Sequence, residues 1–495
     1  MKKIILAFTT ALATLSLVSC KDWLDINYSP NSPSADIVTA DMIFPAAEMA
    51  LASSYGDQFY FMGSYLSEHF TQYFGTSNYL AYSQFTVSQS ATSTRYQYMN
   101  IAIANATEVR NKAAEAGEWG TYLAATTIRV FAYQVLADAY GEVPYSEAMQ
   151  GKDNLSPKFD EGQDIYAGLV AELDDALSKV SSGDAVTTNF LFQNYKDSSE
   201  WIKFANALKL KILMREHAVV DVKAQLTALV NEGNFPTSDV AWTGIWADES
   251  GKANPLYQEE VASYFGSTQT NMCLNVALLR TMQQSDDNRL GSFFKKNDNG
   301  EYWGGISGYN MSTSKIYKSA VCCAPNLAYD DPVNLITVSE IEFFLSEYYR
   351  KVAGNESAAK EHYEAAVRAS FASAGVSGAE SVLKAWPYDG TDKSLGVQKW
   401  VALSGTNGFE AWCELRRLGY PAFGGLKAED IYNFTSDEID ATKLTAGELY
   451  TPYQVYTEVG ASSLAQRFPY ALSSTNYNTN APAVKKSSVK VFWAK

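Results

Sequence analysis

Histidine, cysteine and positive charge are scarce in this chain, and each shortage argues against a class of function. Only three His occur in 495 residues, too few to favour a catalytic or metal centre built on imidazole. The five Cys include no Cys-x-x-Cys pair, so zinc-ribbon and thioredoxin-like sites have no support. Lys and Arg number 39 against 55 Asp and Glu, and the resulting charge of −16 repels phosphate backbones. We therefore expect no nucleic-acid partner.

Motifs of the common enzyme classes are missing as well. The chain has no Gly-x-Ser-x-Gly, no His-Glu-x-x-His and no glycine-rich phosphate loop. A glycosidase needs two carboxylates about 5–9 Å apart across a sugar. Acidic pairs such as Asp174-Asp175, Asp286-Asp287 and Asp330-Asp331 arise by chance among 55 acids and are better explained as solvated faces or caps. We expect no enzyme activity, no cofactor and no bound metal.

The chain begins with a short apolar segment that is typical of an export signal. Basic Met1-Lys2-Lys3 precedes a mostly apolar stretch from Ile4 to Val18, shorter than the roughly 20 residues of a membrane-spanning helix. Leu17-Val18-Ser19-Cys20 resembles the lipobox of bacterial lipoproteins, in which the Cys becomes the lipidated first residue. The alternative is an ordinary signal peptide followed by a chance Cys.

This segment predicts three parts of the chain. Residues 1–19 are expected to be a lipoprotein signal peptide, and Cys20 is expected to carry the lipid, including palmitate. Residues 20–38, rich in Asn, Ser and Pro, are expected to be the anchor and a tether. Residues 39–495 would form the folded domain. No later segment has about 18 uninterrupted apolar residues, so the protein is predicted to be anchored to a membrane without spanning it.

Four further cysteines leave the disulfide state open. Cys273, Cys322, Cys323 and Cys413 pass through an oxidising compartment if the chain is exported. Adjacent Cys322 and Cys323 would form a strained ring with each other, so a bridge from either one to Cys273 or Cys413 is the more plausible pairing. Buried free thiols are the equally weighted alternative.

Apolar residues at steps of three and four predict amphipathic helices along much of the chain. Asp197-Ser198-Ser199-Glu200 resembles a capping box that opens one of them. Helix pairs with Tyr and Ala at these spacings resemble tetratricopeptide hairpins, although no clean repeat is present. The clearest predicted helices cover residues 119–140, 163–180, 199–213, 339–352 and 356–371.

Two regions lack this periodicity and predict a second, loop-rich lobe. Gly, Asn, Ser and aromatics dominate between residues 233 and 335, and short elements with long loops are expected from 390 to 495. The helical scaffold is therefore expected mainly at 39–232 and 336–375. Long irregular stretches in a folded chain are common places for binding. The predicted fold is mainly α, a tetratricopeptide-like α-α superhelix with a loop-rich second lobe.

Several segments in this order resemble the SusD/RagB family of outer-membrane nutrient-binding lipoproteins. Tyr140-Gly141-Glu142-Val143-Pro144-Tyr145-Ser146-Glu147-Ala148 is similar to a signature that follows a family helix. Asp286-Asp287-Asn288-Arg289-Leu290 is similar to another element, with Asp-Asn where Asp-Pro is usual. Glu340 to Glu347 and Asn407 to Pro421 resemble two more. In the last, Arg416 and Arg417 beside Glu410 and Glu414 predict an ion-pair cluster on one helix.

The resemblance implies a function in nutrient uptake. A member of this family sits at the cell surface, lipid-anchored in the outer membrane, and partners a TonB-dependent β-barrel transporter of the SusC type. It binds a nutrient, here most simply an oligosaccharide or other glycan, and delivers it without covalent chemistry. Two alternatives stay open: capture of peptides, as in the RagB branch, and a structural lid on the transporter that binds no ligand.

Aromatic clusters are the best candidates for the ligand site. Sugar rings present C–H faces that stack on Trp and Tyr, while amides and acids bond the hydroxyls. The strongest candidate is the segment with Tyr302, Trp303 and Tyr309, where Gly304 and Gly305 are expected to let a ligand approach the backbone. The other candidates are Tyr79, Tyr82, Trp242, Trp246 and Tyr264.

Overall fold

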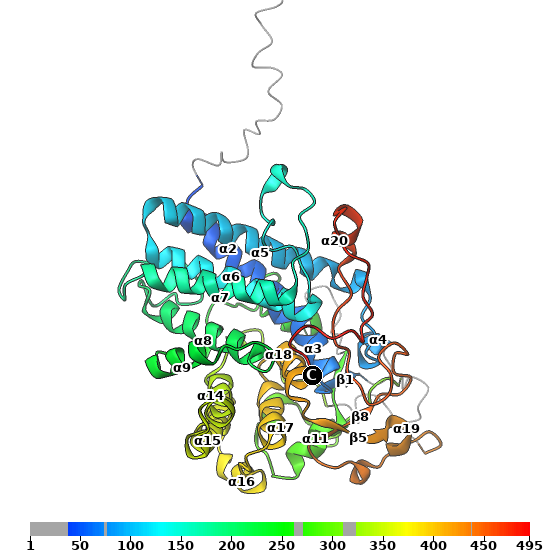
Figure 1. Cartoon of the computed structure of the whole chain (residues 1–495). Helices are drawn as coiled ribbons and strands as arrows, with labels where there is room; N and C mark the ends of the chain where they lie inside the picture. Colours follow the sequence, from blue (N-terminus) through cyan, green and yellow to red (C-terminus); the bar gives the residue numbers. More distant parts are fainter. Residues whose placement is uncertain (1–37, 74–76, 262–270, 310–322, 437) are drawn as a thin grey trace, which may run out of the picture.

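The protein is mainly helical, and its longest helices pack together on one side of the molecule (Figure 1). The computed structural model describes residues 38–73, 77–261, 271–309, 323–436 and 438–495. Its longer helices are α2 (Ala40–Ser54), α5 (Gln89–Ala116), α6 (Trp119–Tyr140), α7 (Gly162–Lys179), α8 (Ser199–Glu216), α9 (Lys223–Glu232), α11 (Val276–Gln283), α14 (Val338–Tyr348), α15 (Glu356–Ser373), α17 (Asp392–Leu403) and α18 (Gly408–Leu418). No helix in these ranges is both long and apolar enough to cross a membrane.

Shorter helical elements connect or extend the long ones. The α-helical ones are α3 (Tyr60–Leu66), α4 (Leu80–Ser83), α10 (Pro255–Glu260), α12 (Arg289–Phe293), α16 (Ala379–Ala385), α19 (Ala428–Ile431) and α20 (Leu472–Tyr477). Two π-helical turns, η2 (Tyr55–Phe59) and η5 (Tyr349–Ala353), extend α2 into α3 and lengthen α14; η3 (Gly151–Asp153) and η6 (Ala441–Lys443) are 3₁₀ turns.

The helices predicted from apolar periodicity are confirmed. Helix α6 ends where expected, because Gly141 adopts a φ of +79° that an L side chain rarely tolerates. Helices α7 and α8 lie at the expected positions, and Gly354, at φ +67°, separates η5 from α15. The capping box before α8 is not formed. The Ser198 side chain makes no capping hydrogen bond to the first turn of α8. The carboxylate of Asp197 instead accepts hydrogen bonds from the Ser199 amide and hydroxyl.

Consecutive helices pack side by side and form the predicted tetratricopeptide-like scaffold. α5 packs against α6, α6 against α7 and α8, and α14 against α15, while α2 lies along α5. In Figure 1 these helices run as a layered stack on the left of the molecule. Each helix buries an apolar stripe against its neighbour, which supplies most of its stability.

Two helices from the region expected to be loop-rich belong to the scaffold. α17 packs on α14, and α18 packs on both α17 and α3. Gly63 and Gly408 make the α3–α18 contact possible: a Cβ on Gly63 would lie 2.4 Å from the Cα of Phe409, and one on Gly408 would lie 1.9 Å from Ser64 Oγ. The irregular second lobe at this end of the chain therefore starts after Leu418, later than residue 390.

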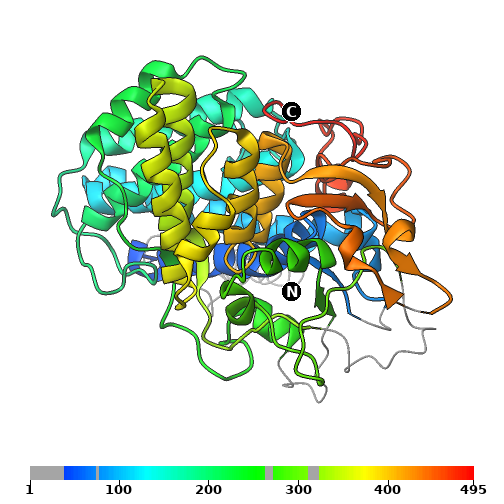
Figure 2. The ribbon, with the colours of Figure 1, turned by 90° about the horizontal axis from the view of Figure 1, so that it is seen from below.

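The second lobe combines short helices, short paired strands and loops, and its strands between residues 422 and 451 lie on the right of Figure 2. Its strands pair two by two: β1 (Phe70–Gln72) with β3 (Met272–Leu274), β2 (Val240–Trp242) with β4 (Val333–Ile336), β5 (Ala422–Lys427) with β8 (Glu448–Thr451), and β6 (Tyr432–Asn433) with β7 (Glu438–Ile439). Only the β5–β8 pair is parallel. A bulge in β2 interrupts its register with β4.

Buried charged side chains join five helices of the scaffold. The Arg417 guanidinium lies 2.5 Å from Glu347 and 2.7 Å from Glu414, and Lys399 lies 2.9 Å from Glu414. Arg215 pairs with Asp138 at 2.5 Å and also with Glu410. We call this set the buried ion network; its members are Asp138 of α6, Lys211 and Arg215 of α8, Glu340 and Glu347 of α14, Lys399 of α17, and Glu410, Glu414 and Arg417 of α18.

Of the predicted Glu–Arg cluster on α18, only the Arg417–Glu414 pair forms within the helix. Glu410 pairs instead with Lys211 and Arg215 of α8, and the Arg416 guanidinium donates to the carbonyl oxygens of Asp138 and Gln466. Charge pairing holds the pKa of Glu347 well below its usual range despite its burial, because Arg417, His217 and Lys351 surround it. Burial lowers the pKa of Lys399 to about 8.

The cysteines that the structure describes are buried free thiols. These are Cys273, Cys323 and Cys413. Burial raises the pKa of both Cys323 and Cys413 to about 11, so these thiols stay protonated at neutral pH. Cys322 lies outside the described residues.

Glu48, a buried acid of α2, links this helix to the loop that precedes α8. The Glu48 carboxylate accepts hydrogen bonds from the Phe190 amide at 2.7 Å, the Leu191 amide at 3.0 Å and the Trp242 indole at 3.4 Å. Burial outweighs these donors and raises the pKa of Glu48 to about 7. The same cause raises the pKa of Asp57 and of Glu216 to about 7.

Replacing Arg417 by Met should strongly destabilise the scaffold, because two buried carboxylates lose their partner. We expect Arg417→Met to lower the free energy of unfolding by about 3–5 kcal/mol in urea denaturation. The matched control is Arg368→Met, since Arg368 also contacts two acids, Glu364 and Glu380, but on the exposed surface. Arg368→Met should lower the free energy of unfolding by less than about 1 kcal/mol. Equal losses in the two variants would contradict a structural role for the network.

Stability should fall as pH rises from about 4.5 to 7. In this window folded Glu48 keeps a proton that the unfolded chain releases, so the folded state binds more protons and loses stability until about pH 7. Glu48→Gln should reduce this decline by up to about 3 kcal/mol. Urea denaturation at pH 5 and at pH 7.5 measures the change in the free energy of unfolding between these two pH values. The control is Glu115→Gln, which removes an exposed carboxyl. An unchanged pH dependence in Glu48→Gln would show that this carboxyl is ionised throughout.

Candidate functional site

Four aromatic rings from three segments meet at the surface of the second lobe. Tyr309, Tyr432, Phe434 and Tyr453 form this group, which we call the aromatic face. The ring centroid of Tyr309 lies 5.2 Å from that of Tyr432, 5.1 Å from Phe434 and 5.3 Å from Tyr453. Tyr432 is buried beneath the others, Tyr309 and Tyr453 are half-buried, and Phe434 is 42% exposed. The arrangement is an exposed ring on a packed aromatic base.

A short hairpin presents Phe434 to solvent. Strand β6 pairs with β7, and Phe434 is the first residue of the turn between them. The side-chain oxygen of Asn433 accepts hydrogen bonds from the amides of Thr435 at 2.9 Å and Ser436 at 3.2 Å, a local turn that Asn favours. The same turn contains Asn433 and Ser436, both of which are exposed.

Gly308 allows Tyr309 to join the face. Its φ is +85°, and a Cβ at this position would lie 2.1 Å from the carbonyl oxygen of Tyr453. The Tyr453 amide also donates to the Ser307 carbonyl at 2.9 Å. A side chain at residue 308 would separate the two segments, so the glycine is needed for the Tyr309–Tyr453 contact.

Hydrogen bonds link the aromatic face to the scaffold through β1 and α4. Gln72 donates to the Tyr309 carbonyl and accepts from Ser83, and Gln84 donates to the Gly308 carbonyl at 3.0 Å. Strand β1 is in turn attached to α17. Burial lowers the pKa of His69 to about 3, and its neutral ring donates to the Trp400 carbonyl at 2.9 Å. Hydrogen bonds therefore connect Tyr309 through β1 to helix α17 of the scaffold.

Tyr79 and Tyr82 form a second aromatic cluster on α3. The Tyr79 ring stacks on Phe61 with centroids 4.7 Å apart, and Tyr82 lies 5.7 Å from Tyr79. The Tyr79 hydroxyl donates to the buried Glu260 carboxylate at 2.6 Å. Both tyrosines are half-buried, and Ser83 next to them bonds Gln72, which connects this cluster to the aromatic face. The structure thus brings Tyr79, Tyr82 and Tyr309 into one neighbourhood.

Tyr302 and Trp303 lie at the other end of the segment that carries Tyr309. The Lys296 ammonium lies 5.4 Å from the centre of the half-buried Tyr302 ring. The Trp303 amide donates to Cys323 Sγ at 3.1 Å, and its ring packs partly against the core. Of the three aromatic residues in the best-supported sequence cluster, only Tyr309 belongs to the aromatic face.

The expectation that Gly304 and Gly305 face a ligand is wrong. A Cβ on Gly304 would lie 2.6 Å from the Val276 Cα, and one on Gly305 would lie 2.8 Å from the Thr71 methyl group. Both glycines are buried and let this segment approach β1 and the start of α11. They serve packing within the protein.

The remaining predicted residues lie elsewhere or outside the described ranges. Trp242 is fully buried in β2, where its indole reaches Glu48, so its ring has no face open to a ligand. Trp246 is half-buried and donates to the Trp242 carbonyl at 3.1 Å. Tyr264 and Cys20 lie outside the residues that the structure describes.

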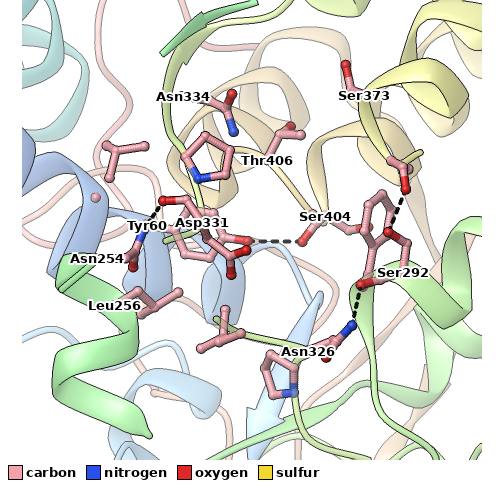
Figure 3. Close-up of a pocket in the computed structure, with 18 of the residues that line it drawn as sticks. Tyr60, Asn254, Leu256, Ser292, Asn326, Asp331, Asn334, Ser373, Ser404 and Thr406 are labelled. Carbon is pink, nitrogen blue, oxygen red and sulfur yellow. Dashed lines mark hydrogen bonds between the residues drawn. The ribbon is translucent and has the colours of Figure 1, made fainter. Parts of the chain in front are cut away.

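A cavity of about 190 Å³ lies between the scaffold and the second lobe, and we call it the polar cavity (Figure 3). None of the eight aromatic residues predicted for the site lines it. Its wall includes three Asn, two Asp, three Ser, one Thr and the ring of Tyr60. Within the described ranges, no three His, Cys, Asp or Glu side chains are grouped so that they could hold a metal ion.

Sequence reasoning missed Tyr432, Phe434 and Tyr453 of the aromatic face. They meet Tyr309 only through the tertiary fold. Local signals were present, since Tyr432 and Phe434 flank the turn former Asn433, and Tyr453 lies between Tyr450 and Tyr456.

Comparison with known proteins gives one family and a consistent fold. The family model for SusD-like proteins, described as starch-binding associating with outer membrane, matches residues 30–441. A SusD homologue from Bacteroides uniformis is 22% identical, with a TM-score of 0.72 over 92% of this chain and 99% of that one. A chitin-binding SusD homologue from Flavobacterium johnsoniae is 18% identical, with a TM-score of 0.70 over 92% and 98%. No curated protein matches the chain significantly.

Proposed function

The chain belongs to the SusD-like family, and we propose that it is a cell-surface lipoprotein that captures a glycan. In this proposal the aromatic face binds an oligosaccharide, and the protein delivers it to a partner TonB-dependent β-barrel transporter of the SusC type. Binding and release need no covalent chemistry. The family description supports the outer-membrane setting, and the lipobox-like segment ending at Cys20 supports a lipid anchor.

The exposed Phe434 ring on its aromatic base is the observation that carries the ligand assignment. Tyr309 and Tyr453 pack against Phe434 at 5.1 and 5.4 Å, so the ring is held in place while one side stays open to water. A sugar ring that stacks there removes apolar surface from water on both partners. Because the base is already packed, little side-chain entropy is lost on binding.

Polar groups suited to sugar hydroxyls lie in the same turn as Phe434. Asn433 offers amide donors and Ser436 a hydroxyl, and both residues are exposed and within two positions of Phe434 in the chain. Glu438 accepts a hydrogen bond from the Ser436 hydroxyl at 2.9 Å, which orients that group. The structural neighbour from Flavobacterium johnsoniae is a chitin-binding protein, which supports a glycan as the ligand class.

The scaffold is the proposed contact surface for the transporter. Its helices are joined by the buried ion network and therefore offer a rigid, broad face. The second lobe carries the ligand separately, so docking and capture use different parts of the chain. The two alternatives, a protein that captures peptides and a structural lid on the transporter that binds no ligand, are distinguished by the test below.

Truncation of two rings of the aromatic face should abolish glycan capture. We propose calorimetric titration of the purified protein with a panel of oligosaccharides, beside the double variant Phe434→Ala and Tyr309→Ala. Nucleic-acid bases stacked on aromatic rings gain about 1–3 kcal/mol each. We expect a sugar ring to gain a similar amount, so affinity for the bound glycan should fall at least about tenfold.

Tyr477→Ala is the matched control. Tyr477 is 81% exposed at the end of α20, which Figure 1 shows at the opposite end of the second lobe from α19. This variant should bind like the parent protein. Glycan binding that survives loss of both rings would move the site away from the aromatic face. Absence of binding to any glycan, with binding to peptides, would reject the glycan assignment.

A further inference from the structure

The polar cavity is built from segments that are far apart in sequence. Its walls come from η2 and α3 at the start of the scaffold, the ends of α15 and α17, and the loops around α10, α12 and β4. No residue of the aromatic face lines it. Its volume of about 190 Å³ is below the range of about 300–1,000 Å³ found for pockets that hold drug-sized ligands. The cavity therefore suits a small ligand, such as a single sugar ring, better than a polymer.

Hydrogen bonds within the protein hold the lining polar groups in place. Asn254 donates to the Asp331 carbonyl at 2.9 Å, and the Tyr60 hydroxyl donates to the Ser404 carbonyl at 3.2 Å (Figure 3). One carboxylate oxygen of Asp331 accepts from the Ala328 amide at 2.7 Å. The other oxygen, Oδ1, accepts no hydrogen bond from the described residues. The site is therefore preorganised and keeps a free acceptor.

Asn334 presents its side-chain amide to the cavity. Its backbone belongs to β4, opposite Ala241, while its side chain lines the cavity. The residue is only 9% exposed, yet its amide atoms are not among the buried side-chain atoms that lack a hydrogen bond in the described ranges. The amide is therefore open to water in the cavity and can bond a ligand there. Figure 3 shows this amide at the upper end of the cavity, beside Thr406.

The charge of the lining selects among ligands. Two carboxylates, Asp239 and Asp331, line the cavity, and no Lys, Arg or His does. Burial raises the pKa of Asp331, and Lys295, which lies outside the lining, acts in the opposite direction. An anionic ligand would meet two carboxylates and no cationic side chain in the cavity wall. Hydroxyl groups, which both donate and accept, match this set of amides, acids and hydroxyls.

Apolar surface in the cavity completes a pattern suited to sugars. Phe293 and Tyr60 supply aromatic rings to the wall, and both are half-buried. Gly405 lies against Phe293, since a Cβ there would be 2.1 Å from the Phe293 ring. A ring with polar edges and C–H faces can bond the amides and also contact these side chains.

We propose that the polar cavity is a second binding site, which takes a single neutral sugar ring such as a free monosaccharide. It is independent of the aromatic face, shares no residue with it, and does not require that face to bind a glycan. Asn334 and the free oxygen of Asp331 bond hydroxyls of the sugar, and Thr406 borders it.

The test is ligand-observed NMR and calorimetry on the purified protein with glucose, galactose, N-acetylglucosamine and glucuronate. At least one neutral sugar should bind saturably, with a Kd on the order of 1 mM. Glucuronate should bind at least about tenfold more weakly than glucose or not at all. Asn334→Leu, which keeps the size of the side chain and removes the amide, should weaken binding of the neutral sugar at least about tenfold.

Three further variants decide the outcome. Thr406→Val removes a bordering hydroxyl with little change of shape and should weaken binding even if Asn334→Leu perturbs folding, which circular dichroism would reveal. Tyr477→Ala, which lies outside both sites, should leave monosaccharide binding unchanged. Monosaccharide binding that is lost in Phe434→Ala but kept in Asn334→Leu and Thr406→Val would place the sugar on the aromatic face. Absence of saturable binding by every neutral sugar, or binding that neither Asn334→Leu nor Thr406→Val alters, would overturn the proposal.

Discussion

The buried ion network is the interaction on which the rest of the structure depends. Arg417 and Glu414 belong to α18, but their partners lie on α14, α17 and α8, so the network specifies which helices are neighbours. Charges buried at this depth cost free energy unless each has its partner. A helix that shifted by one turn would leave several charges unpaired. The network therefore selects one packing of the scaffold, and Asp138 extends it to the C-terminal segment through the indole of Trp493 at 2.9 Å.

Both candidate binding sites take their geometry from this scaffold. The Trp400 indole of α17 donates to the Ser67 carbonyl at 2.8 Å, shortly before β1, and β1 continues through Gln72 to Tyr309. The polar cavity uses the other side of the same junction, where Tyr60 of α3 bonds the end of α17. The second lobe contributes loops, and the scaffold determines where these loops meet. Rigid elements that position irregular segments are a common basis for binding sites.

Local patterns and non-local contacts explain what the sequence could and could not predict. Apolar periodicity located α6 to within a residue, and glycine marked its end, because both signals act within one helix. The Glu414–Arg417 pair of α18 could be predicted from its spacing, whereas Glu347, the other partner of Arg417, lies 70 residues away and could not. Trp242 looked like a surface aromatic in irregular sequence, but its pairing with β4 and with Glu48 buries it. Asn334, Phe434 and Tyr453 were missed because only the fold brings them to their sites.

The aromatic face is the surface on which we propose that a glycan is held, and the proposed function depends on it. A crystal structure of the protein with a bound oligosaccharide tests this claim most directly. We expect a sugar ring stacked on Phe434, in contact with Tyr309 or Tyr453, and with a hydroxyl bonded to Asn433 or Ser436. An ordered oligosaccharide on any other surface, with the Phe434 ring still open to solvent, would contradict the claim.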